Sequence, residues 1–219
     1  MKVVIVNSGV ANVRSVANML RRFRTDSEIS DDPSVVAAAD VLILPGVGSF
    51  DSAMRKFRER GLIEPLNDKV LRLGTPVLGL CLGMQLMGYS SEEGEESGLG
   101  WIPGHLKKLP SESEDGARVR VPHMGWNIIG DREGCLLYDG MGDEIRFYFD
   151  HSYYFIPDAP EHYCGTVEHG RRFAAGIRSG NIFGVQFHPE KSHRFGLALF
   201  ENFIAYAQGH VRSPVGVTG

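Results

Sequence analysis

A histidine and a glutamate follow a short apolar segment near the carboxyl end of the chain. In the stretch GVQFHPEKS, residues 184–192, His188 and Glu190 stand two positions apart with a proline between them. The proline fixes one backbone angle and prevents a helix from beginning there. In an extended segment, side chains two positions apart point to the same side, so the carboxylate can hold the imidazole in one tautomer. The spacing therefore predicts a general base, His188, that is oriented by Glu190.

A cysteine that could act as the nucleophile lies in GLCLGMQ, residues 79–85. The glycines around Cys81 indicate a sharp turn from a strand into a helix, which exposes one side chain. The following helix N-terminus favours a thiolate and later an oxyanion, and the backbone N–H of Leu82 is a natural oxyanion donor. The alternative is that Cys81 is a small buried hydrophobic residue, as free cysteines often are. The turn makes the two interpretations about equal.

A third glycine-rich strand end is LPGVGSF, residues 44–50. It lacks the G-K-[ST] of a P-loop and the full G-x-G-x-x-G of a dinucleotide site. It is compatible with a simple tight turn, or with backbone N–H groups at the carboxyl edge of a sheet, where open α/β folds bind ligands. Because Cys81, His188 and this segment each follow a predicted strand, we expect them at one edge. A nucleophile, a base and an orienting carboxylate together are suited to thiol catalysis.

The elements that must position these groups change in character along the chain. Over the first ninety residues, short apolar runs alternate with helical patterns, which is typical of a mostly parallel sheet covered by helices on both faces. From about 100 to 190, aromatic-rich strand-like segments, including 118–121, are separated by turns, and we expect antiparallel strands there. Residues 195–206 predict a closing helix. One α/β domain over 1–207 and a loose tail over 208–219 are expected.

Composition restricts the functional class. The formal charge of −4 gives no electrostatic reason to expect nucleic acid or an anionic membrane as a partner. No apolar run approaches the ~18 residues of a membrane span, and no signal-peptide pattern begins the chain, so the cytoplasm is expected.

The cysteines give no pattern of paired spacing. Cys81, Cys135 and Cys164 are odd in number, widely spaced and without a C-x-x-C pair. We therefore expect neither a disulfide framework nor a zinc site, and we interpret Cys135 and Cys164 as structural. His123 and His151 have no third ligand spaced to join them, so no metal site is predicted. No other cofactor is expected.

Several motifs together resemble the class-I, triad-type glutamine amidotransferases, whose α/β domain is flavodoxin-like. The motifs PGVGSF, GLCLGMQLMGYSSEE, LGWIPG, VPHMGWN, DHSYYF and GVQFHPEKS occur in this order. Their order is similar to that in the glutaminase subunit of imidazole glycerol phosphate synthase, over roughly residues 1–207. The HMGWN and HPEKS blocks favour this subunit over the carbamoyl-phosphate, GMP and anthranilate glutaminases.

The resemblance implies a role for each matching residue. Cys81 would attack the side-chain amide of glutamine to form a γ-glutamyl thioester, His188 would move the proton, and Glu190 would orient the ring. The oxyanion would be held by the backbone N–H groups of Val47 and Leu82. The groups expected to grip glutamine are Gly46, Gly48, Gln85, Glu93, Ser152 and Tyr153. For Glu93 the alternative is a solvated acidic loop, and Gln85 could simply face solvent.

The resemblance also implies a partner. In the family, ammonia passes to a separate (β/α)8-barrel cyclase, which makes imidazole glycerol phosphate and an aminoimidazole carboxamide ribotide in histidine biosynthesis. The expected interface residues are Asn12, Trp126, Asn127, Tyr148 and Lys191. An exposed tryptophan is a plausible anchor, although a core tryptophan is a nearly equal alternative.

Some features leave alternatives open. Asn7-Ser8-Gly9 and Asp150 depart from the family pattern, and the region between Lys107 and Arg120 is longer than usual. A paralogous glutaminase that feeds another amidation, a γ-glutamyl thiol hydrolase that needs no partner, and a catalytically dead binding subunit are the competing functions. The intact Cys-His-Glu set argues against the last of these.

Overall fold

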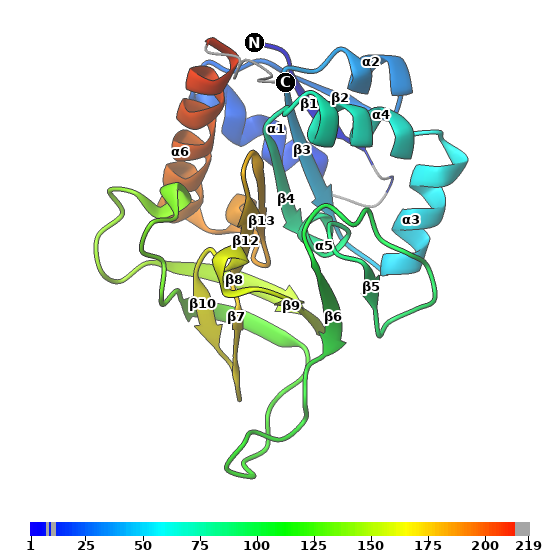
Figure 1. Ribbon diagram of the computed structural model, residues 1–219. Coiled ribbons are helices and arrows are strands. Elements are labelled where there is room, and N and C mark those ends of the chain that lie inside the picture. Colours follow the sequence, from blue (N-terminus) through cyan, green and yellow to red (C-terminus); the bar gives the residue numbers. More distant parts are fainter. Residues whose placement is uncertain (8, 10–11, 213–219) are drawn as a thin grey trace.

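The central feature of the computed structural model, which describes residues 1–7, 9 and 12–212, is a six-stranded sheet (Figure 1). Its strand order is β12-β13-β4-β3-β1-β2, and every neighbouring pair is parallel except β12 and β13. The strands are β1 (Val3–Val6), β2 (Ser27–Ser30), β3 (Val41–Gly46), β4 (Val77–Cys81), β12 (Gly176–Ser179) and β13 (Ile182–Val185). The apolar runs of the sequence are the buried strands, because a sheet covered on both faces needs apolar side chains on both.

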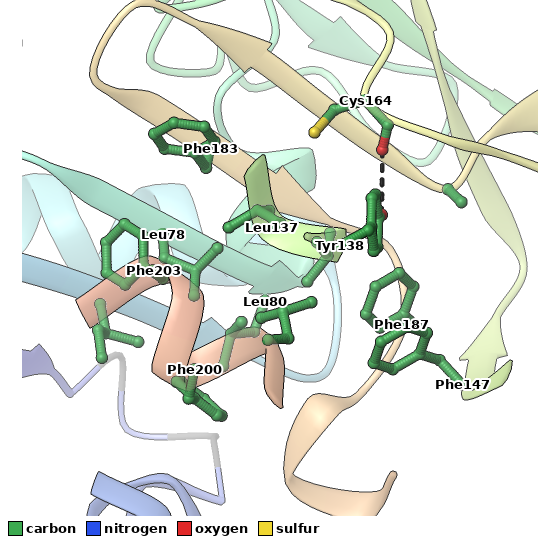
Figure 2. Packing of buried hydrophobic residues seen from close by; sticks show 14 of the residues in the cluster. Leu78, Leu80, Leu137, Tyr138, Phe147, Cys164, Phe183, Phe187, Phe200 and Phe203 are labelled. Carbon is green, nitrogen blue, oxygen red and sulfur yellow. Dashed lines mark hydrogen bonds between the residues drawn. The ribbon is translucent and has the colours of Figure 1, made fainter. Parts of the chain in front are cut away.

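Helices cover the two faces of this sheet. Alternate side chains of β1 enter different clusters, Ile5 with Leu20 and Phe200, and Val4 with Phe50. One face is covered by α1 (Val13–Arg22) and α6 (His193–Arg212). The other is covered by α2 (Pro33–Ala37), α3 (Phe50–Glu59) and α4 (Ile63–Asn67), which continues as a π-turn at Asp68–Arg72. Figure 2 shows the aromatic residues that join α6 to β4.

Smaller sheets, antiparallel except for the parallel pair of β5 and β6, lie beyond the carboxyl ends of β3 and β4 (Figure 1). Strands β7 (His123–Ile128) and β8 (Arg146–His151) form one pair. A second sheet contains β5 (Ser90–Ser91), β6 (Gly104–Lys108) and β9 (Tyr153–Pro157). A third contains β10 (Thr166–Glu168) and β11 (Arg172–Ala174). Short 3₁₀ turns occur at Leu136–Tyr138, Pro160–His162 and Pro189–Lys191, and α5 (Leu82–Gln85) is a single helical turn. The second half is therefore rich in antiparallel strands, as predicted.

Two local expectations were wrong. The segment 118–121 is not a strand; only an isolated bridge joins Glu112 to Arg118, and the chain from 110 to 122 forms a projecting hairpin-like loop (Figure 1). The alternation of Val119 and Val121 with arginines has no neighbouring strand to pair with. Helix α6 continues to Arg212 instead of ending near Tyr206, so residues 208–212 are helical and residues 213–219 of the expected tail lie outside the described chain.

The expectation for the cysteines was also wrong. Cys135 and Cys164 form a disulfide, with Cα atoms 5.4 Å apart and a sequence separation of 29 positions, while Cys81 is free. The spacing could not reveal this pair, because the fold alone brings the turn at Cys135 beside the segment before β10. Within the described residues, no helix has the length and apolarity needed to cross a membrane.

Candidate active site

Cys81 lies at the turn between β4 and α5. Its backbone has φ +51° and ψ −109°, a conformation that L-residues rarely adopt, and the side chain is 6 % exposed. A Cβ added to Gly79 would lie 2.7 Å from the backbone of Gly83, and one on Gly83 would lie 1.6 Å from the carbonyl oxygen of Leu44. Both glycines are therefore required for the chain to turn this sharply against β3. Such strain is typical of a nucleophile held by its scaffold.

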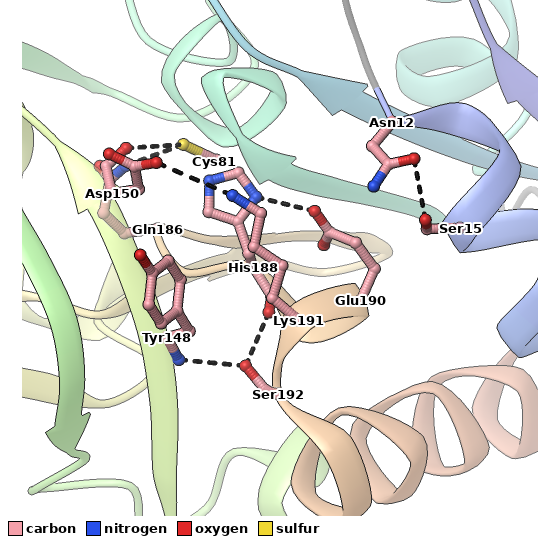
Figure 3. Close-up of polar contacts among 10 residues, drawn as sticks. All are labelled: Asn12, Ser15, Cys81, Tyr148, Asp150, Gln186, His188, Glu190, Lys191 and Ser192. Carbon is pink, nitrogen blue, oxygen red and sulfur yellow. Dashed lines mark hydrogen bonds and ion pairs between the residues drawn. The ribbon is translucent and has the colours of Figure 1, made fainter.

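His188 and Glu190 lie next to this turn. Nδ1 of His188 is 2.8 Å from Oε1 of Glu190, and both side chains are about 5 % exposed or less. Figure 3 shows the imidazole between the Cys81 sulfur and the glutamate. Burial lowers the pKa of His188, but the neighbouring Cys81 and Glu190, through hydrogen bonding and charge, outweigh it and raise the pKa to about 10. The surroundings thus stabilise an imidazolium beside the sulfur.

Backbone contacts fix the position of His188. Its N–H donates to the carbonyl of Tyr148 on β8, at 2.8 Å. The fully buried hydroxyl of Ser192 donates to the carbonyl of His188 at 2.6 Å and accepts the N–H of Tyr148 at 3.0 Å. These bonds join the 3₁₀ turn after His188 to β8 and hold the imidazole at the sheet edge. The role of Ser192 was missed in the sequence, although its place in HPEKS was the available signal.

A cavity of about 330 Å³ opens at Cys81. The predicted residues that line it are Val47, Gly48, Cys81, Leu82, Gln85, Glu93, Ser152, Tyr153 and His188. Gly46 is not in the lining but pairs in register with Cys81, and Glu190 contacts the far side of the His188 ring. The lining also includes Pro122, Asp150 and His151, which the sequence did not single out for the cavity.

Two of the lining residues have clear internal anchors. Oε2 of Glu93 accepts the N–H of Phe50 at the start of α3, at 2.8 Å, so this carboxylate is directed inward from its acidic loop. The side chain of Gln85 is 6 % exposed, and its Nε2 donates to the carbonyl of Tyr153 at 2.9 Å. The alternatives of a solvated Glu93 and a solvent-facing Gln85 do not describe these side chains.

Gln186 is a site residue that the sequence reasoning missed. It is fully buried on the strand end before His188, where a glutamine would ordinarily be unfavourable. Its Oε1 accepts from Gln85 at 3.2 Å, and its Nε2 points to the Cys81 sulfur at 3.8 Å. The sulfur is also 3.9 Å from the carbonyl oxygen of Asp150. The only available signal was a polar residue inside the otherwise apolar run 182–187.

The expected interface residues lie in different environments. The Trp126 side chain is 46 % exposed, and its ring centroid lies 6.2 Å from that of Tyr148 and 5.7 Å from that of His193. Nζ of Lys191 is 5.3 Å from the Tyr148 ring centroid and 3.7 Å from Oδ2 of Asp150. Trp126 is therefore not a core residue.

The other two interface candidates have internal bonds. Asn127 donates inward to Nε2 of His123 and to the carbonyl of Glu168. The exposed Asn12 accepts from Ser15 at the start of α1 (Figure 3). Ser8 lies outside the described residues.

The chain is similar to known proteins over nearly its whole length. The family model described as glutamine amidotransferase class-I matches residues 4–206. A protein of Pseudomonas aeruginosa named imidazole glycerol phosphate synthase subunit HisH 2 is 43 % identical over 202 residues, 92 % of this chain and 98 % of the relative. A protein of the same name from Methanococcus maripaludis is 44 % identical over 205 residues, 94 % of this chain and 100 % of the relative.

Solved structures are similar in fold at low identity. One titled as a glutamine amidotransferase has a TM-score of 0.70 at 17 % identity, covering 94 % of this chain and 98 % of that chain. Another, titled as the structure of PurLQS from Thermotoga maritima, has a TM-score of 0.69 at 18 % identity with the same coverage. These likenesses concern the fold alone.

Proposed function

This chain belongs to the class-I glutamine amidotransferases, and from that membership we propose that it is the glutaminase subunit of an imidazole glycerol phosphate synthase in histidine biosynthesis. It hydrolyses glutamine to glutamate and ammonia. The observation that carries the proposal is the placement of Cys81, His188 and Glu190 around one cavity at the carboxyl edge of the sheet. Near-full-length relatives that carry the name of this subunit support the choice of pathway.

The reaction follows from the positions of these groups. His188 holds the proton of the Cys81 thiol as an imidazolium, and the resulting thiolate attacks the side-chain carbonyl carbon of glutamine. When the C–N bond breaks, His188 returns that proton to the leaving nitrogen, which departs as ammonia and leaves a γ-glutamyl thioester. Water then attacks the thioester and gives glutamate and the free thiol. Glu190 holds the ring by its bond to Nδ1, so Nε2 is the atom that exchanges the proton.

The cavity supplies groups for the rest of the substrate. The N–H groups of Leu82 and Val47 are our candidates for stabilising the oxyanion, since both residues line the cavity beside Cys81. Gly48, with φ +96° and open space around its Cα, allows the loop after Gly46 to turn its N–H groups. Gln85, Glu93 and the backbone of Ser152 and Tyr153 surround the remaining volume, and an inward carboxylate such as Glu93 suits the α-ammonium group.

The acceptor of the ammonia is a separate cyclase subunit, which we propose to be a (β/α)8 barrel. It would dock on the face formed by Trp126, Tyr148 and Lys191, which lie together next to the strand end that carries His188. Exposed aromatic residues beside a cation are typical anchors of such interfaces. Asn12 would lie at the edge of this surface, whereas the inward bonds of Asn127 favour a structural role for it.

A partner-independent γ-glutamyl hydrolase and a glutaminase that feeds another amidation are the two alternatives. One experiment separates all three: glutamine hydrolysis is measured for the chain alone, with the cyclase, and with the cyclase plus its ribotide substrate. The proposal expects slow hydrolysis by the chain alone and stimulation that needs the cyclase. Full activity of the lone chain would favour the independent hydrolase, and no response to the cyclase would favour another pathway.

A further inference from the structure

Two buried histidines that the hydrolysis does not use lie at the wall of the cavity, where His151 is part of the lining and His123 lies behind it. His123 on β7 and His151 on β8 face each other across the strand pair, and Nδ1 of His123 is 3.0 Å from Nε2 of His151. Their exposed fractions are 3 % and 6 %. The ring of His123 is packed between Phe149 and His169, with centroids 4.5 and 4.1 Å away. Buried polar groups are almost always hydrogen-bonded, so each ring nitrogen of this pair needs a partner.

The neighbours of the pair allow only one direction for these bonds. Nδ1 of His151 is 2.8 Å from the carbonyl oxygen of Tyr153, which can only accept, so this nitrogen carries the proton. Nε2 of His151 is then an acceptor, and His123 must donate to it from Nδ1. Nε2 of His123 in turn accepts from the amide of Asn127, at 3.2 Å. Burial lowers the pKa of both histidines to about 3, so the neutral, directional arrangement persists at physiological pH.

The inner end of this chain of bonds reaches the nucleophile. The carbonyl of Tyr153 also accepts from Gln85, which donates its second N–H to Gln186, and Gln186 points to the Cys81 sulfur. The outer end, Asn127, belongs to β7, whose alternate residues Met124, Trp126 and Ile128 are exposed. A continuous series of hydrogen bonds therefore runs from the outer strand to the sulfur, and the two imidazoles are its middle.

We propose that His123 and His151 are positioning residues for glutamine hydrolysis, which hold Tyr153 and, through it, the amides of Gln85 and Gln186 in place beneath Cys81. This inference rests on the proposed function. Neither histidine exchanges a proton with substrate. Each fixes a backbone carbonyl or a neighbouring ring that a small displacement would move away from the reacting atoms.

The test compares two substitutions of His123. His123→Phe keeps an aromatic ring in the same packing but has no N–H, whereas His123→Asn keeps an N–H near the position of Nδ1. We expect His123→Phe to lower kcat by roughly 10- to 100-fold, since a displacement of about 1 Å at a reacting group has an effect of this size. The kcat of His123→Asn should lie between those of His123→Phe and the wild type. His162→Phe is the matched control. Nδ1 of His162 contacts the backbone carbonyl of Arg178 on β12, away from the cavity, so this substitution should change neither kcat nor KM.

Two readouts separate positioning from folding. The first readout is kcat in the presence of the cyclase and its substrate, divided by the fraction of Cys81 that a glutamine-analogue electrophile labels. If the role of His123 were merely structural, the substitution would lower the melting temperature and the labelled fraction. The kcat per labelled Cys81 would then stay unchanged. The rate of Cys81 alkylation by iodoacetamide is measured in parallel and needs no glutamine turnover. A changed alkylation rate in a chain that never hydrolyses glutamine would support the positioning role and reject the proposed function. Wild-type values of both quantities in His123→Phe, or equal losses in the Asn and Phe variants, would overturn the inference.

Discussion

Ser192 and His188 are joined by a hydrogen bond of 2.6 Å from the serine hydroxyl to the histidine carbonyl, at a position where Ser192 has no exposure to solvent. The same hydroxyl accepts the N–H of Tyr148. The substitution Ser192→Ala leaves this N–H buried without its acceptor, so we expect a loss of about 1–3 kcal/mol in the free energy of unfolding and a lower kcat from a displaced His188. Urea unfolding and glutaminase assays measure the two effects. The exposed Ser111→Ala is the control and should remain within about 0.5 kcal/mol of the wild type.

Replacing the nucleophile should abolish hydrolysis without affecting the partner. We expect Cys81→Ala to lose glutaminase activity by at least about 10⁴-fold, a loss comparable with removal of other triad nucleophiles. The complex with the cyclase should still form product from added ammonia, because only the source of ammonia is lost. A glutamine-analogue electrophile should label Cys81 alone, since Cys135 and Cys164 are paired. Substantial glutaminase activity in Cys81→Ala would show that another group is the nucleophile.

Substitutions of Glu190 and of His188 should lower kcat by different amounts. Glu190 contacts only Nδ1 of His188, and its Oε2 has no hydrogen-bond partner among the described residues. Glu190→Gln therefore weakens the orientation of the ring but leaves a proton acceptor, and we expect a kcat roughly 100-fold higher than that of His188→Ala. Steady-state kinetics with saturating glutamine make the comparison. Equal losses would mean that the glutamate takes part in the proton transfer itself.

The buried histidine pair should make the fold sensitive to acid. Burial lowers the pKa of His123 and of His151 to about 3, below the usual value of about 6.5 in an unfolded chain. Between these values the unfolded chain binds protons that the folded protein does not, so the contribution of the pair to stability is complete above about pH 6.5 and decreases as the pH falls toward 3. Urea unfolding at pH 7.0 and pH 5.0 should show a smaller decrease for His123→Phe than for the wild type. An equal decrease in the free energy of unfolding for both proteins would show that other groups control the loss of stability in acid.

The glycine turn around Cys81 gives a stability test with a matched substitution. Gly83→Ala would place a methyl group 1.6 Å from the carbonyl oxygen of Leu44, so we expect a loss of more than about 3 kcal/mol in the free energy of unfolding. Gly209 lies within α6 with nothing within 4 Å of an added Cβ. There the same change should stabilise the helix by about 0.5–1 kcal/mol. Thermal and urea unfolding of the two variants, measured together, distinguish a tight contact from a general effect of alanine.

The sequence was informative where one local pattern decides the structure. The apolar runs of β3 and β4 and the glycines beside Cys81 each dictate their own conformation, and they predicted both the parallel sheet and the place of the cavity. Predictions failed or were missing where two distant segments decide jointly. The disulfide of Cys135 and Cys164 and the amide contact of Gln186 with Gln85, 101 residues apart, exist only once the sheets have assembled. The segment 118–121 shows the reverse case, since its strand-like alternation finds no neighbouring strand and forms only the isolated bridge of Arg118 with Glu112.

Strand β7 has an inner and an outer face, formed by alternate residues. His123, Gly125 and Asn127 lie toward the protein, whereas Met124, Trp126 and Ile128 lie toward solvent, and only β8 pairs with this strand among the described elements. Substitutions on the outer positions can therefore alter what the strand recognises without touching the histidine pair. A single residue inserted or deleted within the strand, between His123 and Asn127, would place these two side chains on opposite faces and break the contact between them. An insertion in the loop between residues 111 and 117 leaves the register unchanged, because the pairing with β8 and the alternation within β7 set it, so variants of this loop length should remain active.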